Sequence, residues 1–133
     1  MNERLMNDLQ NLSHVHVIEI SDDLSWVKVN DFVMPPGFNC DLCNVLIELP
    51  RDYPQSPPGC ARHIYIPRDV RWQGRQLRDL HPNVMPRNGK GWAWLCFEWI
   101  KWNPMQDNLI TTVELIRTTR RGRDSRTAKI INS

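Results

Sequence analysis

Four prolines fall within nine residues near the middle of the chain, in the stretch Pro50–Pro58 (Pro-Arg-Asp-Tyr-Pro-Gln-Ser-Pro-Pro). Proline fixes φ and lacks a backbone donor, so this stretch must be a stiff loop rather than a helix or a central strand. Apolar runs with strand character lie on both sides of it, Leu42–Leu49 before and Ala61–Ile66 after. The sequence therefore predicts two strands joined by a rigid connection.

The residues before this loop show one helical period followed by strand-like runs. Leu5, Leu9 and Leu12 recur at helical spacing and predict a short amphipathic helix over Asn2–Leu12. Three strands are predicted before the loop and a fourth after it, at Val15–Ile20, Trp26–Met34, Leu42–Leu49 and Ala61–Ile66. One helix followed by consecutive strands indicates an α+β fold built on a four-stranded antiparallel meander.

The second half of the chain is less regular. Pro67–Gly91 is rich in Arg, Gly, Pro and Asn and predicts a long, mostly irregular loop. Gly91–Trp102 then sets five aromatic residues around Cys96, a segment too apolar to be left in water. A C-terminal helix is predicted after it, capped by Asp107 or Asn108, with the apolar positions Leu109, Val113 and Ile116.

Composition indicates a water-soluble chain of one domain. The chain has 133 residues, of which 41% are apolar and 24% charged, and no apolar run approaches the roughly 20 residues that a membrane span requires. Charges and amides among the first residues argue against a signal peptide, which favours the cytoplasm. The four cysteines are then expected to be thiols, metal ligands or a nucleophile rather than a disulfide framework.

Charge gives a weak indication of partners. The formal net charge is only +2, but six basic residues lie between Arg117 and Lys129. A solvated helix end followed by a frayed tail explains them better than a nucleic-acid site does. We therefore expect a domain over residues 1–121 and a poorly ordered basic tail over residues 122–133.

Three short motifs occur in a fixed order and carry a resemblance. Tyr53-Pro54-Gln55-Ser56-Pro57-Pro58 is followed by His81-Pro82-Asn83 and then by Cys96, thirteen positions beyond Asn83. In this order, and with Trp102-Asn103-Pro104 before the last helix, the chain resembles the ubiquitin-conjugating enzyme family (the UBC-like fold). It is most similar to short prokaryotic members, which work with a ubiquitin-like modifier and an activating enzyme, and some of which serve in defence against phage.

The resemblance implies roles for individual residues. Cys96 would carry the modifier as a thioester, and a lysine amine of a protein substrate would then displace it. Asn83 would stabilise the oxyanion or hold its loop, and His81 would anchor the local backbone. No cofactor is implied for the chain, because the activating partner uses the ATP. The apolar surroundings of Cys96 are expected to raise the pKa of its thiol.

Two departures from the family pattern affect these expectations. The interval between Asn83 and Cys96 is longer than in most eukaryotic members, which bears on the placement of Asn83. The chain also ends after one helix, where the family usually has a pair of closing helices.

Other interpretations of the sequence remain open. Cys40, Cys43, Cys60 and His63 have the spacing of a zinc site, but a hairpin would separate Cys43 from Cys60 by roughly 20 Å. A zinc-stabilised nucleic-acid binder, with tryptophans as stacking platforms, is therefore the least favoured interpretation. A non-catalytic adaptor of the same fold, which binds the modifier or a partner enzyme, is the main alternative to an enzyme.

Overall fold

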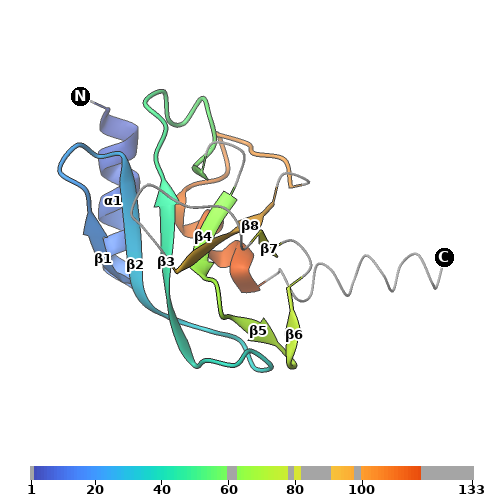
Figure 1. The fold of residues 1–133 in the computed structure, drawn as a ribbon. Helices are drawn as coiled ribbons and strands as arrows, with labels where there is room; N and C mark the ends of the chain where they lie inside the picture. The colour runs from blue at the N-terminus through green and yellow to red at the C-terminus, as the bar shows by residue number, and fades with distance from the viewer. Residues whose placement is uncertain (1, 60–62, 78–79, 82–90, 98–99, 118–133) are drawn as a thin grey trace.

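The computed structural model describes residues 2–59, 63–77, 80–81, 91–97 and 100–117, without the side chains of residues 76, 80 and 81. Figure 1 shows its elements: α1 (Glu3–Val15), β1 (Val17–Ile20), β2 (Trp26–Val33), β3 (Leu42–Glu48), β4 (His63–Pro67), β5 (Arg71–Trp72), β6 (Arg75–Gln76), β7 (Leu80–His81) and β8 (Trp92–Cys96). A further helical stretch covers residues 109–117. The predicted α+β fold, in which one helix precedes and one helix follows the strands of an antiparallel sheet along the chain, is confirmed.

The first helix forms where its leucine stripe predicts. Asn2 caps it, because the Asn2 side-chain oxygen accepts a hydrogen bond from the Leu5 backbone nitrogen at 2.9 Å. Leu5, Leu9 and Leu12 are all buried, so the apolar face lies against the core. The helix continues to Val15, which the sequence assigned to the first strand, and that strand begins only at Val17.

The first four strands form the predicted meander within a larger sheet. The strand order is β1-β2-β3-β4-β8-β7, and each adjacent pair is antiparallel. The register of β2 against β3 shifts between Val29 and Phe32, where Asp31 has a φ of 55° and its backbone nitrogen donates to the Asn44 side chain. This irregularity is a β-bulge, which increases the local twist.

Residues Trp92–Cys96 form a strand that the sequence did not predict. They pair with β4 along their whole length and with β7 on the other side. The sheet of the described residues therefore has six strands rather than the four predicted. Ala93 and Leu95 point into the core, whereas Trp92, Trp94 and Cys96 lie half-buried on the other face. Large apolar side chains on both faces hide the strand alternation in the sequence, and this explains the error.

The region Pro67–Gly91 also contains more structure than predicted. β5 and β6 form a small hairpin, whose two-residue turn uses Gln73 and Gly74 with φ of 50° and 75°. Positive φ at both positions suits the right-handed twist of a tight hairpin. Residues 78–79 and 82–90 of this region lie outside the described part of the chain.

The core lies between one face of the sheet and the two helical segments. It combines the leucines of α1 with Val45 and Ile47 of β3, Ile64 and Ile66 of β4, and Val113 and Ile116 of the last helix. That helix is capped by Asn108, whose side chain accepts from the Thr111 nitrogen at 3.0 Å, as one of the two predicted caps. Among the described residues, no helix has the length and apolarity that a membrane crossing requires.

Candidate active site

Cys96 is the last residue of β8, on the sheet face that points away from the helices. Its neighbour Leu95 is fully buried in the core, and alternation along the strand directs Cys96 to the opposite face. There it is half-buried and carries a thiol rather than a disulfide. Cys96 thus keeps part of its surface exposed, as a residue that reacts with another protein must.

The predicted partners of Cys96 are only partly described. His81 belongs to β7, and its backbone pairs with Trp94, two residues before Cys96. The start of the His-Pro-Asn motif therefore runs beside the strand that bears the cysteine. The His81 side chain and all of Asn83 lie outside the described residues, so the distance from Asn83 to Cys96 stays a prediction.

His63 is the neighbour of Cys96 that sequence reasoning missed. It is the Cα partner of Cys96 across β4 and β8, and only 8% of its surface is exposed. Its ring meets the Trp94 ring edge-on, with 3.7 Å between centroids and 67° between planes. The sequence suggested His63 only as one ligand of a disfavoured zinc site, because it did not predict the pairing of β4 with β8.

The zinc interpretation finds no site among the described residues. Cys43 lies on the core face of β3, where its thiol donates to the Met34 sulfur at 3.3 Å, while His63 lies on the opposite face of the sheet. Burial raises the pKa of the Cys43 thiol to about 12, which disfavours the thiolate that zinc requires. No three His, Cys, Asp or Glu side chains of the described segments are grouped to hold a metal, and Cys60 lies outside these segments.

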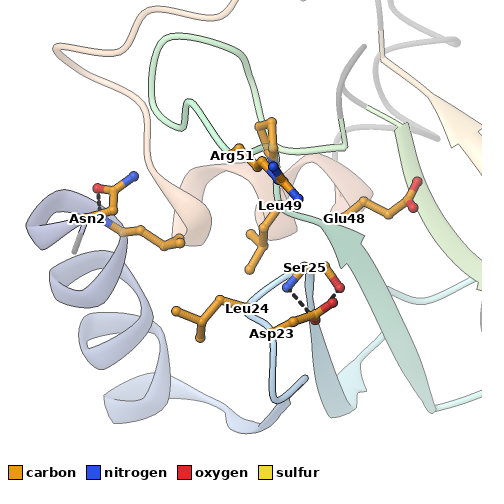
Figure 2. A pocket seen from close by; sticks show the side chains of 9 residues that line it. Asn2, Asp23, Leu24, Ser25, Glu48, Leu49 and Arg51 are labelled. Carbon is orange, nitrogen blue, oxygen red and sulfur yellow. Dashed lines mark hydrogen bonds between the residues drawn. The ribbon is translucent and has the colours of Figure 1, made fainter.

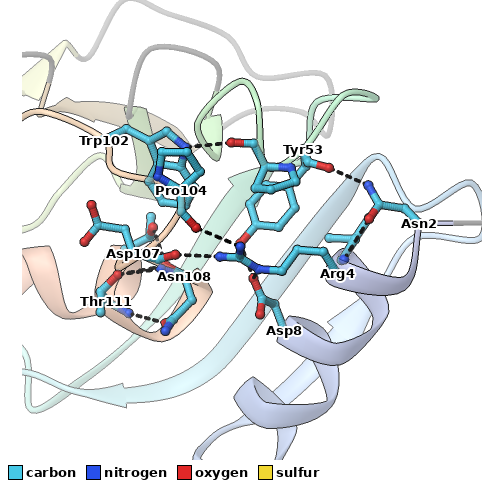
Figure 3. Close-up of polar contacts among 12 residues, drawn as sticks. Asn2, Arg4, Asp8, Tyr53, Trp102, Pro104, Asp107, Asn108 and Thr111 are labelled. Atoms are coloured by element: carbon cyan, nitrogen blue, oxygen red, sulfur yellow. Dashed lines mark hydrogen bonds and ion pairs between the residues drawn. The ribbon is translucent and has the colours of Figure 1, made fainter.

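Two of the family motifs meet beside the first helix, as Figure 3 shows. The Trp102 indole nitrogen donates to the Pro54 carbonyl at 2.8 Å, and the Trp102 and Tyr53 rings lie 5.9 Å apart. The Tyr53 hydroxyl donates to the Asp8 carboxylate of α1, and Asn2 donates to the Tyr53 carbonyl. The Tyr-Pro loop and the Trp-Asn-Pro segment are thereby fixed to the same end of α1.

Arg4 completes this connection. Its guanidinium donates to the Asp8 carboxylate at 2.7 Å and to the backbone carbonyls of Pro104 and Asp107 at 2.8 and 2.6 Å. Burial lowers the pKa of Arg4, but its hydrogen bond and charge interaction with Asp8 outweigh that effect and raise it overall. The chain that follows Cys96 is therefore anchored to the helix that begins the fold.

Asp107 lies close to Cys96 in the sequence and precedes the last helix. Its carboxylate accepts from the Asn103 backbone nitrogen at 2.8 Å, and its carbonyl accepts from Arg4. Both groups of Asp107 therefore stabilise the turn before the last helix. Glu98, another carboxylate close to Cys96 in the sequence, lies outside the described residues.

A pocket of about 530 Å³ lies at the end of the sheet near the start of α1, shown in Figure 2. Its lining includes Leu24, Leu49 and Arg51, and the Asp23 carboxylate within it accepts from the Ser25 hydroxyl at 2.6 Å. Cys96 is not part of this lining.

The fold and the motif positions define the class of protein: a UBC-like α+β domain, the fold of ubiquitin-conjugating (E2) enzymes. Residues 5–121 match the model of prokaryotic E2 family E, and the chain belongs to that family. The comparisons with curated proteins and with solved structures gave no match. Membership of an E2 family implies in general terms a ubiquitin-like modifier and an activating (E1) enzyme as partners.

Proposed function

We propose that this chain accepts a ubiquitin-like modifier from an activating enzyme as a thioester on Cys96 and transfers it to an amine of a protein substrate. The observation that carries the proposal is the position of Cys96, which is only half-buried at the end of β8 within a chain of an E2 family. Cysteine suits this step because a thiolate attacks an acyl carbonyl well and the resulting thioester remains reactive towards amines.

The two other predicted residues have supporting roles in this proposal. Asn83 donates its amide to the oxyanion that forms when the amine attacks the thioester, a contribution that is typically about 3–4 kcal/mol of barrier for one donor. His81 holds the backbone beside β8, consistent with its pairing to Trp94. Asn83→Ala should therefore slow transfer to lysine while leaving formation of the Cys96 thioester nearly unchanged.

A thioester assay tests the proposal directly. The full chain is incubated with its activating enzyme, modifier and ATP, and the products are separated with and without reductant. Wild type should give an adduct that reductant cleaves, Cys96→Ala none, and Cys96→Ser an adduct that resists reductant because it is an ester. Cys40→Ala is the matched control, since Cys40 is also a half-buried cysteine but is not on β8.

Two outcomes would contradict this proposal. If Cys96→Ala still forms the adduct, another residue is the acceptor. If no adduct forms but the chain binds the modifier or activating enzyme equally well with and without Cys96, the chain is a UBC-like adaptor. Either result removes Cys96 from the chemistry.

We also propose the cellular setting that kinship suggests, a cytoplasmic conjugation system that protects bacteria against phage. Four cysteines in a chain of this length are more often thiols than a disulfide framework, which agrees with a reducing compartment. The test is a plaque assay on cells that carry the chain with its genomic neighbours. Protection should be lost with Cys96→Ala and kept with Cys40→Ala, and equal protection by both variants would contradict a role for conjugation.

A further inference from the structure

Cys96 and His63 are direct neighbours across two strands. The register of β4 against β8 makes them Cα partners, although they lie far apart in the sequence. Directly opposed residues of antiparallel strands point to the same face and have Cβ atoms about 4.5–5.5 Å apart. The Cys96 and His63 side chains therefore extend from neighbouring positions on the same face of the sheet.

His63 is more deeply buried than Cys96. His63 is buried to all but 8% of its surface, and its edge-on packing against Trp94 restricts rotation of the ring. Cys96 is only half-buried. A partly exposed thiol beside a buried imidazole is an arrangement that suits a nucleophile and its base.

A carboxylate lies on the other side of His63. Leu46 and Tyr65 are Cα partners on β3 and β4, and Glu48 and His63 each lie two residues further towards the same end of the sheet. Glu48 and His63 are therefore level on adjacent strands and on the same face. Figure 2 shows the Glu48 side chain pointing towards β4, where the Tyr65 hydroxyl donates to it at 3.1 Å.

Few charged side chains lie on the same sheet face as His63 in the described strands. The charged and titratable groups on this face of β2, β3, β4 and β8 are Lys28, Glu48, Tyr65, His63 and Cys96. Lys28 is paired with Glu19 at 3.0 Å, two strands away from His63. The charged group level with His63 on these strands is thus the Glu48 carboxylate, on the side away from Cys96.

We propose that His63 accepts the proton of the Cys96 thiol, an inference that rests on the proposed function. When the modifier arrives as a thioester on the activating enzyme, the proton moves from Cys96 to His63 and the sulfur attacks the thioester carbonyl carbon. The bond from that carbon to the activating enzyme's cysteine breaks, and the leaving thiolate takes the proton from His63. One thiol and one thioester are consumed and one of each is formed.

The experiment measures how fast Cys96 reacts with iodoacetamide as a function of pH, in the full chain and without any partner. Tryptic peptide Gly91–Lys101 contains Cys96 alone, so mass spectrometry reports its alkylation separately from that of the other cysteines. A thiol paired with His⁺ reacts as thiolate about one pH unit or more below an ordinary cysteine. Wild type at about pH 7 should then keep roughly a quarter of its rate at about pH 9.5.

His63→Gln should lower that fraction to roughly one thirtieth, about a sevenfold fall, because glutamine cannot take the proton. Dividing each variant's rate by its own rate at high pH cancels differences in access to the sulfur. His16→Gln is the matched control, since His16 also packs on an aromatic ring, 5.5 Å from Phe32, but lies just before β1 at the opposite edge of the sheet. It should leave the Cys96 profile unchanged.

Cys43 reports whether the variant is folded, because only 6% of it is exposed in the native chain. If His63→Gln leaves Cys43 protected and the Cys96 profile equals that of wild type, the proposal is wrong. If Cys43 becomes reactive, NMR titration of His63 in the wild type and in Cys96→Ala replaces the test. The midpoint for His63 should fall when the thiol is removed, and equal midpoints would refute the pairing.

These results separate the inference from the function on which it rests. A thioester that forms equally fast with His63→Gln, together with an unchanged alkylation profile, removes His63 but keeps Cys96 as acceptor. A shifted profile without any thioester in the wild type keeps the pair but removes the conjugating function. Slow thioester formation with His63→Gln, and a normal rate with His16→Gln, supports both.

Discussion

Replacing Arg4 with alanine removes three hydrogen bonds at once and tests how the motif-bearing segments are held together. Arg4 bonds the Asp8 carboxylate on its own helix and the carbonyls of Pro104 and Asp107 in the segment that follows Trp102. The Asp8 side chain is 6% exposed, so it stays nearly desolvated when Arg4 is lost. Its remaining bond is then the one from the Tyr53 hydroxyl.

The size of the effect follows from the exposure of each group. The Arg4 side chain is 33% exposed, so solvent screening reduces its ion pair with Asp8 well below the value of a buried pair. Each lost bond to a carbonyl costs about 1 kcal/mol, and the Asp8 carboxylate left with fewer partners costs a further ~1–2 kcal/mol. We therefore expect Arg4→Ala to reduce the free energy of unfolding by about 3 kcal/mol.

Urea unfolding followed by circular dichroism measures this loss. Arg51→Ala is the matched control, because Arg51 is an exposed arginine two residues before Tyr53. It should change the free energy of unfolding by less than about 0.5 kcal/mol. Asp8→Asn and the double variant complete a double-mutant cycle, with an expected coupling of about 1–2 kcal/mol between Arg4 and Asp8. A loss as small as that of the control, or strictly additive single effects, would refute the reasoning.

Three further changes have effects that the structure defines. Burial raises the pKa of Tyr53, so its neutral form stabilises the fold below the ordinary tyrosine range, and the free energy of unfolding should fall above about pH 10 in wild type and less steeply in Tyr53→Phe. The pKa of Cys43 is raised to about 12, so stability should also fall from about pH 9 upwards, by at most ~1.4 kcal/mol per pH unit, and Cys43→Ala should remove that part. Trp102→Phe keeps the ring but loses the bond to the Pro54 carbonyl, which should cost about 1 kcal/mol in urea unfolding; an unchanged midpoint would mean that water replaces the indole there.

The sequence predicted those elements whose two faces differ in polarity. In Leu42–Glu48, buried Cys43, Val45 and Ile47 alternate with Asn44 and other residues of the opposite face, and the strand lies where expected. β8 has tryptophans on one face and core residues on the other, so its alternation of buried and half-buried positions does not appear as a change of polarity. Its segment was therefore recognised as apolar but not as a strand.

Only part of the candidate site could be predicted from the sequence. Cys96 followed from the order of the short motifs, which is a property of the sequence alone. The neighbourhood of His63 and Cys96 depends on the pairing of β4 with β8, a long-range contact that local patterns do not encode. The role of Trp102 in fixing the Tyr-Pro loop required the same kind of information, since its partner Pro54 belongs to a distant loop.

Because Cys96 is the last residue of β8, the sheet holds the backbone of the proposed nucleophile. The sequence assigned no helix or strand to the segment that carries Cys96, but β8 lies between β4 and β7 and is hydrogen-bonded on both sides. Four of the residues between Asn83 and Cys96, Trp92–Leu95, belong to this strand. A sulfur on such an element keeps a fixed geometry to a base on the neighbouring strand, whereas one on a loop would need partner binding to create it. In the proposed reaction, partners then need only to bring the incoming carbonyl to this pair of side chains.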